Sequence, residues 1–166
     1  KMEPGTIEKI EQEKVKCLES HDKSVEAEQA AMEATADIPE VGDYITYEIA
    51  NDSILIVRAA PDAIRAYHNV CPHRGRRLVS TSKGGNGARG NATKQTFFCG
   101  FHGWSFDLEG KNTHILDKDD WKGALNAERT CLSELKADTW GGWVYINMDP
   151  NCEPLLDFLG DVARIL

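Results

Sequence analysis

The sequence predicts an all-β core of short antiparallel strands, with a charged helix before it and the start of a second helix after it. Short apolar segments separated by turn residues run from residue 38 to residue 147, which is typical of antiparallel sheets. Residues 1–36 carry nine acidic and five basic side chains and no aromatic ring. Residues 154–166 place leucines at helical spacing after a proline. The length of 166 residues suits one main domain.

The first segment, residues 1–36, predicts one long charged helical arm. A thin apolar stripe recurs at spacings near 3.6 and 7 residues, and alanines at positions 27, 30, 31 and 34 add helix propensity. This arm is either a solvated, partly disordered segment or a helix that binds a partner. We expect residues 37–153 to form the main domain, and residues 154–166 to begin a helix leading to a further domain.

The strands follow from alternation and from turn residues. Residues 44–50 alternate polar and apolar side chains, Asn51-Asp52 is a turn, and residues 53–59 are mostly apolar, which together predict a hairpin. Pro61-Asp62 predicts a second turn before a strand over residues 64–70. Shorter strands are expected at residues 97–98, 104–108, 132–137 and 143–147.

Residues that interrupt regular structure predict a loop in one remaining segment, and helical spacing predicts a helix in the other. Residues 80–94 are rich in Gly, Ser, Asn and Thr, and Gly84-Gly85-Asn86-Gly87-Ala88 at their centre predicts a loop without regular structure. From Pro154 to Leu166 the chain predicts one helix with a leucine-rich side.

The composition excludes several classes of function. The chain has 19 basic and 27 acidic residues and a net charge of −8, so we expect no general binding to nucleic acids or membranes. No apolar segment approaches the roughly 18 residues of a membrane-spanning helix, and no signal peptide is visible. Five scattered cysteines predict reduced thiols and a cytoplasmic protein. Because the first residue is Lys1, we expect the chain to be an excised piece.

Two short motifs carry the chemistry. Cys71-Pro72-His73 is followed by Arg74-Gly75, and Cys99-Gly100-Phe101-His102, which begins 26 residues after His73, is followed by Gly103. Each motif offers one sulfur and one nitrogen from a turn, so we expect the two loops to converge on one metal centre. The expected ligands are Cys71, His73, Cys99 and His102.

The other cysteines and histidines are expected to be packing or surface residues: Cys17, Cys131, Cys152, His68 and His114. A mononuclear iron site built from His21, His68 and His114 is not expected, because they stand far apart and no two are at helical spacing.

The mixed ligand pairs discriminate between two metal centres. Zinc accepts two sulfurs and two imidazoles, but zinc fingers usually pair Cys with Cys and His with His. One Cys and one His in each loop suit a [2Fe–2S] cluster in which one iron takes both cysteines and the other both histidines. At this point the sequence strongly resembles Rieske proteins. Replacing two thiolates by neutral imidazoles makes the oxidised cluster less negative, which raises its reduction potential.

The flanking residues narrow the resemblance to the large (α) subunits of ring-hydroxylating oxygenases, over roughly residues 37–166. The stretches that carry it are residues 37–44, 64–75, 102–110, 140–150 and 153–160. Respiratory Rieske proteins have a further Cys in each loop, where this chain has Arg76 and Phe101. They also have hydroxyl side chains where this chain has Trp104 and Phe106, so the resemblance implies a lower reduction potential.

The resemblance implies a function in electron transfer. A ferredoxin or a flavin reductase would supply electrons, and a mononuclear Fe(II) in a C-terminal catalytic domain, absent from this chain, would use them to insert O2 into an aromatic or related substrate. It also implies neighbouring α subunits in a trimer, with or without a β subunit. The alternatives are a stand-alone Rieske ferredoxin and a zinc-binding structural module.

A run of basic residues lies between the two motifs. From Arg74 to Gln95 there are six basic side chains and no acidic one, in a chain of net charge −8. They are Arg74, Arg76, Arg77, Lys83, Arg89 and Lys94. The run either is a solvated loop with arginines paired to carboxylates of an adjoining subunit, or is a docking patch for an acidic electron donor. For docking, Lys83, Arg89 and Lys94 are the stronger candidates.

Overall fold

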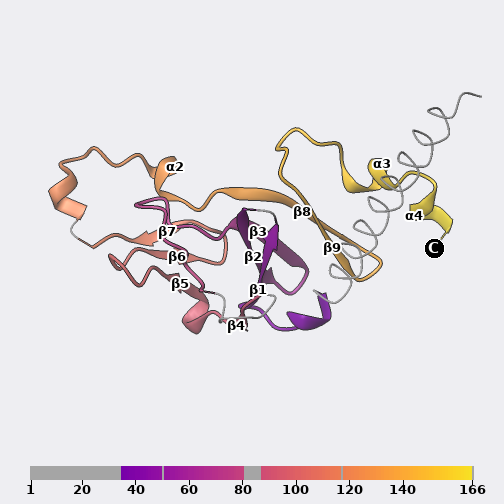
Figure 1. Ribbon diagram of the computed structural model, residues 1–166, viewed down its shortest axis with the longest axis horizontal. Helices are drawn as coiled ribbons and strands as arrows, with labels where there is room; N and C mark the ends of the chain where they lie inside the picture. The colour runs from indigo at the N-terminus through magenta and orange to yellow at the C-terminus, as the bar shows by residue number, and fades with distance from the viewer. Residues whose placement is uncertain (1–34, 50, 81–86, 117, 166) are drawn as a thin grey trace, which may run out of the picture.

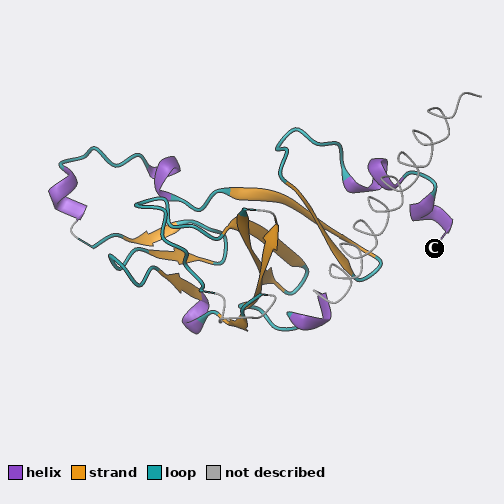
Figure 2. Ribbon diagram, in the orientation of Figure 1, coloured by secondary structure: helices purple, strands orange, loops and turns teal. Residues whose placement is uncertain are grey.

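The computed structural model describes residues 35–49, 51–80, 87–116 and 118–165. The predicted charged helix over residues 1–36 therefore lies outside the described residues, except that residues 35–37 are helical. Strands and loops make up most of the described chain, and its helices are short (Figure 2). No helix in these ranges is both long and apolar enough to cross a membrane.

The larger of two sheets has six strands in the order β4-β1-β2-β3-β8-β9, and every neighbouring pair is antiparallel. The predicted first hairpin is confirmed, with Tyr44 opposite Val57 and Thr46 opposite Leu55. The strands are β1 (Asp43–Ile49), β2 (Asp52–Ala60), β3 (Ala63–His68), β4 (Arg89–Asn91), β8 (Glu134–Trp140) and β9 (Trp143–Asn147).

The smaller sheet has three antiparallel strands in chain order: β5 (Thr96–Phe98), β6 (Ser105–Asp107) and β7 (Asn112–His114). It lies at one end of the molecule, beside the larger sheet, whereas the β8–β9 hairpin extends toward the other end (Figure 1). Besides the helical residues 35–37, the described chain contains two 3-10 helices and three short α-helices: η1 (Thr93–Gln95), η2 (Lys118–Trp121), α2 (Ala127–Thr130), α3 (Leu155–Leu159) and α4 (Val162–Ile165).

Strand β2 is buried on both faces, which explains its uninterrupted apolar run. Leu55 and Val57 point into a core cluster shared with the smaller sheet, whereas Ile54 and Ile56 point into a second cluster on the opposite face of the larger sheet. The first cluster also contains the two cysteines of the ligand motifs. The buried core therefore extends directly into the candidate metal centre.

The structure corrects two predictions of regular structure and adds short elements that the sequence did not predict. Residues 80–94 were expected to lack it, but β4 forms there and pairs with β1, because the Ala88 amide donates to the Thr46 hydroxyl over 2.6 Å and aligns the two segments. The predicted helix over 154–166 is two short helices, α3 and α4, because Gly160 adopts a φ of 53° and ends the first. The short elements β7 and α2 were not predicted.

Candidate metal centre

The first ligand loop follows β3 and is closed by two backbone hydrogen bonds. The Cys71 amide donates to the Arg76 carbonyl over 2.8 Å, and the Gly75 amide donates to the Cys71 carbonyl over 2.9 Å. Gly75 has a φ of 69°, a left-handed conformation that an L side chain rarely adopts. The turn buries Cys71 and leaves His73 half-buried at its outer side.

The second ligand loop joins β5 to β6 and repeats the same construction. The Cys99 amide donates to the Trp104 carbonyl over 2.8 Å, and the Gly103 amide donates to the Cys99 carbonyl over 3.0 Å. Gly103 has a φ of 73°, and like Gly75 it stands four residues after its cysteine. The two loops thus present their ligands from equivalent turns, although their Cys-to-His spacing differs by one residue.

The four predicted ligands come together in like pairs. Cys71 and Cys99 are each only 1% exposed, and their thiols lie within hydrogen-bonding reach of each other. The His73 and His102 rings lie with their centroids 4.6 Å apart. Sulfur therefore faces sulfur and imidazole faces imidazole, although each loop contributes one of each. This is the arrangement that a two-iron cluster with two sulfur and two nitrogen ligands requires.

One orphaned polar atom shows that the site fits a bound metal. Nδ1 of His102 is buried and has no hydrogen-bond partner among the described residues. A buried polar atom without a partner costs free energy, and a metal ion satisfies an imidazole nitrogen. Within the same described ranges, no three Cys, His, Asp or Glu side chains converge on a single ion position. The donor set, with the two thiols together and the two imidazoles together, fits a cluster of two irons.

The surroundings of Cys71 and His73 favour the neutral form of these two side chains before a metal binds. Burial raises the pKa of the Cys71 thiol to about 11, although the backbone amides of His73 and Arg74 oppose this by donating to its sulfur. Burial lowers the pKa of His73, and the neighbouring His102 and Arg74 add to that effect. Metal binding would therefore displace the thiol proton.

Side-chain contacts across the loops support this geometry. Trp104 is 3% exposed and stacks on His73, with centroids 4.9 Å apart and planes 4° apart. The Arg76 guanidinium lies over the Phe101 ring at 5.9 Å, which adds a cation–π contact between the loops. In each pair one residue comes from each loop, so the contacts help to hold the loops together.

Asn69 is a supporting residue that the sequence did not reveal. It is 1% exposed; its amide nitrogen donates to the Val79 carbonyl (2.7 Å) and the Ser53 hydroxyl (3.1 Å), and its amide oxygen accepts from the Val79 amide (3.0 Å). These bonds tie both ends of the first ligand loop to β2. A lone Asn before a Cys carries no sequence signal that distinguishes this role from a turn residue.

The other cysteines and histidines lie in separate elements. His68 is half-buried in β3 and His114 is exposed in β7, while Cys131 and Cys152 are half-buried. Cys17 and His21 lie outside the described residues.

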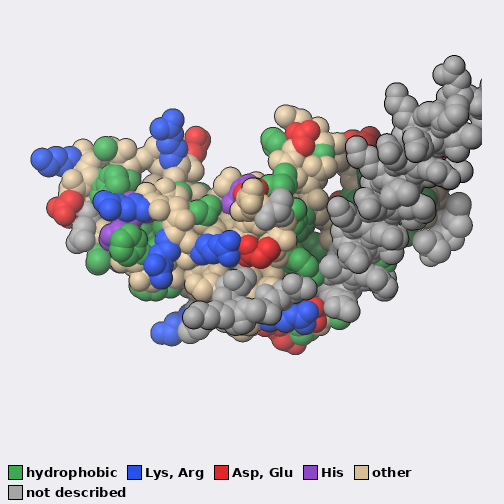
Figure 3. All heavy atoms as spheres, viewed as in Figure 1, with side chains coloured by type: hydrophobic (Ala, Val, Ile, Leu, Met, Phe, Trp, Pro, Cys, Tyr) green, Lys and Arg blue, Asp and Glu red, His purple; other side chains and the backbone are tan. Residues whose placement is uncertain are grey.

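Two residues of the basic run have carboxylate partners within the chain. Arg77 forms a two-pronged ion pair with Glu48, at 2.9 and 3.1 Å, and Arg89 pairs with Asp37. The Arg89 side chain is still about half exposed in this pair, so its role as a docking candidate stays a prediction. Figure 3 shows Lys and Arg side chains over the end of the molecule that contains the smaller sheet.

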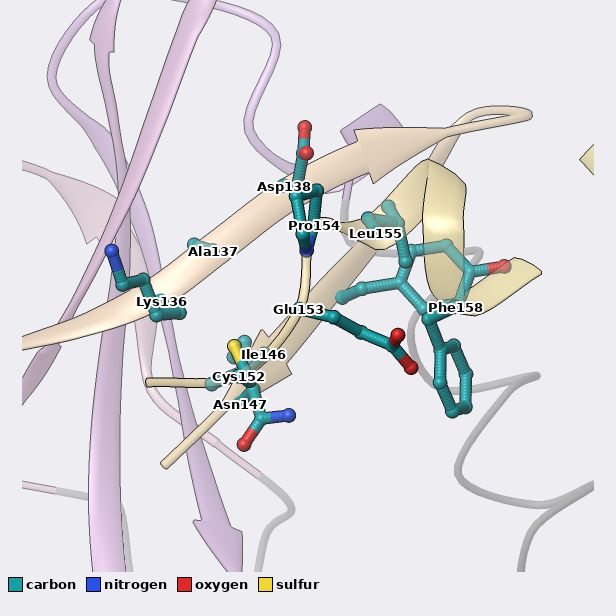
Figure 4. Close-up of a pocket in the computed structure, with 11 residues that line it drawn as sticks. Lys136, Ala137, Asp138, Ile146, Asn147, Cys152, Glu153, Pro154, Leu155 and Phe158 are labelled. Carbon is teal, nitrogen blue, oxygen red and sulfur yellow. The ribbon is translucent and has the colours of Figure 1, made fainter. Parts of the chain in front are cut away.

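A pocket of about 660 Å³ lies away from this centre, between the β8–β9 hairpin and the segment that leads into α3 (Figure 4). Lys136, Asn147, Cys152, Glu153 and Phe158 are among the residues that line it. None of the four predicted ligands is among them, so the pocket is separate from the candidate metal centre.

The chain is similar to known proteins of one family. Residues 28–123 match the Rieske [2Fe-2S] domain family. Over 131 residues the chain is 36% identical to the large oxygenase component of the naphthalene 1,2-dioxygenase system of Pseudomonas putida, covering 78% of this chain and 27% of that protein. Over 133 residues it is 33% identical to the carnitine monooxygenase oxygenase subunit of Escherichia coli K12, covering 80% and 33%.

Solved structures are similar over the same region. A quaternary ammonium Rieske monooxygenase in complex with L-carnitine has a TM-score of 0.67 at 31% identity, covering 79% of this chain and 35% of that one. Naphthalene 1,2-dioxygenase with bound indole has a TM-score of 0.63 at 35% identity, covering 76% and 27%. The predicted all-β fold is thereby confirmed, and the chain spans about a third or less of each of these relatives.

Proposed function

Because this chain belongs to the Rieske [2Fe-2S] domain family, we propose that it is the electron-transferring part of a Rieske oxygenase large subunit. The relatives named above are large or oxygenase subunits, and they match this chain over this region alone. The resemblance of residues 140–150 and 153–160 to oxygenase subunits supports this reading over a stand-alone ferredoxin.

The cofactor is a Rieske-type [2Fe–2S] cluster, and the proposed ligands are Cys71 and Cys99 on one iron and His73 and His102 on the other. The observation that carries this assignment is the pairing of like with like: thiol near thiol, and imidazole 4.6 Å from imidazole. A bound [2Fe–2S] cluster supplies one-electron chemistry. The buried cysteines keep water from the inner side, and the half-buried histidines form the outer edge that a partner approaches.

The residues around the proposed cluster support a low reduction potential for it. Trp104 and Phe106 are buried at the places where respiratory Rieske proteins have hydroxyl groups. The neighbouring Ser105 hydroxyl donates to the Gly103 carbonyl over 3.4 Å, so this donor is directed at the backbone. Fewer hydrogen-bond donors to the cluster sulfurs leave the reduced state less stabilised.

We also propose redox partners and a class of substrate for the whole protein. A ferredoxin or flavin reductase donates electrons, and a mononuclear Fe(II) in the catalytic domain of a neighbouring α subunit receives them. The whole protein is proposed to be a cytoplasmic α-subunit trimer that oxygenates an aromatic or related compound. Relatives named for naphthalene, carnitine and methanesulfonate differ widely in the compound they are named for, so this domain does not specify the substrate.

The test is cluster analysis of anaerobically purified protein. Wild type should bind two irons and two sulfides per chain and give the visible and paramagnetic signals of a reducible [2Fe–2S] cluster. Cys99→Ser should lose these signals, whereas Cys152→Ser, a control at a half-buried free cysteine, should keep them. A full visible spectrum in Cys99→Ser would refute the ligand assignment. A colourless wild-type protein with one zinc would refute the function.

A further inference from the structure

The loop between β7 and α2 places a second indole on the candidate ligand His73. Trp121 ends η2, 19 residues beyond His102, and its ring meets the His73 ring edge-to-face with centroids 5.6 Å apart and planes at 71°. Trp121 also meets Trp104, at 6.2 Å and 68°. Because Trp104 stacks flat on His73, the three rings form a triangle of mutual contacts.

The loop that carries Trp121 is anchored on both sides of it. Ile115 before it and Leu125 after it both pack against the core cluster that contains the ligand cysteines. The Ala124 amide donates to the Trp121 carbonyl over 2.8 Å, and Gly123, with a φ of 82°, completes the turn. In Figure 1 this loop extends, in orange, at the end of the molecule between β7 and α2. The backbone thus fixes the direction from which the indole approaches.

The two histidines have different neighbours. His102 contacts Phe101, its neighbour in the sequence, whereas His73 is held by two indoles that come from other segments. Trp121 is 37% exposed, so one part of its ring covers His73 while another faces solvent. Trp121 therefore lies between the His73 ring and bulk water and covers one side of that ring.

The geometry points to Trp121 as a positioning residue for the cluster. It holds the His73 imidazole against Trp104 and keeps water from that side of the centre. The inference rests on the proposed function, because it concerns the same centre. With neutral histidines the reduced cluster is the more charged state, and water stabilises a more charged state. Removing the cover should therefore favour reduction.

The experiment compares Trp121→Ala and Trp121→Phe with wild type, all carrying the cluster. At the potential where half of the wild type is reduced, the ratio of reduced to oxidised cluster should rise about threefold in Trp121→Ala. A threefold change in this ratio corresponds to a rise of about 28 mV in the reduction potential of a one-electron couple. The paramagnetic signal of the reduced cluster should also change shape, because the His73 ring is freed on one side. Trp121→Phe, which keeps a ring at this position, should give the wild-type ratio and the wild-type paramagnetic signal.

The control is Trp143→Ala, which removes an indole that stacks on Tyr145 in the distant β8–β9 hairpin. It should leave the ratio and the signal unchanged. A wild-type ratio and signal in Trp121→Ala, or an equal shift in Trp143→Ala, would overturn the inference. If Trp121→Ala loads no cluster, Trp121→Leu replaces it. Leu has no ring, so the paramagnetic signal should change in the same way, whereas the ratio should rise by less than threefold because the apolar side chain still excludes part of the water. Absence of the cluster from wild type would instead refute the proposed function.

Discussion

Replacing Asn69 by Ala should loosen the first ligand loop without touching a ligand. The substitution removes both hydrogen bonds to the Val79 backbone and the one to Ser53. A buried polar group left without a partner costs about 1–3 kcal/mol. Val79 is half-buried, so water reaches it in part and the lower half of that range is expected.

Hydrogen exchange of the Val79 amide measures this effect in the cluster-loaded protein. The Val79 amide donates to the Asn69 side chain over 3.0 Å, and its protection reports the opening of that bond. Since 1.4 kcal/mol is a factor of ten, a loss of about 1–2 kcal/mol should speed exchange roughly 5- to 30-fold. Mass spectrometry of a peptide that spans residue 79 resolves such a change.

The matched control is Asn147→Ala. Asn147 is exposed, and its side chain accepts from the Asp149 amide in a turn after β9, over 2.9 Å. This variant should leave the exchange of Val79 at the wild-type rate. If Asn69→Ala changes that rate by less than twofold, Asn69 does not hold the loop, and the energetic argument fails.

Two further predictions test the segment between the ligand motifs. Gly87→Ala should lower the melting temperature at least twice as much as Gly123→Ala, because a Cβ at residue 87 would lie 2.1 Å from the Thr46 carbonyl oxygen whereas one at residue 123 meets nothing within 4 Å. Both glycines have a positive φ, so both substitutions add backbone strain of about 1–2 kcal/mol. Equal decreases in melting temperature, measured by calorimetry, would contradict the steric argument. Lys83→Glu combined with Lys94→Glu should slow reduction of the cluster by its donor in stopped flow, most strongly below about 50 mM salt. Equally fast reduction at low salt would place the donor elsewhere.

The local pattern of the sequence was enough to predict the candidate ligands and to place much of the larger sheet. Turn residues beside Cys71-Pro72-His73 and Cys99-Gly100-Phe101-His102 act within a few positions, and hydrophobic alternation marks strands without reference to distant residues. The first hairpin and β9 lie where these patterns predict. Local patterns alone overestimated the last helix, because the conformation of Gly160 ends it.

Only the tertiary structure decided which residues from distant segments meet. Sheet pairing and the shared core bring the two ligand loops together, pairing sulfur with sulfur and imidazole with imidazole. They also bring Trp121 onto His73 and pair Arg89 with Asp37. Such contacts depend on strand register and on how loops pack on the core, and both are set by many weak interactions distributed along the chain. No spacing within one segment encodes them, so the sequence predicted the ligands and only the fold revealed their neighbours.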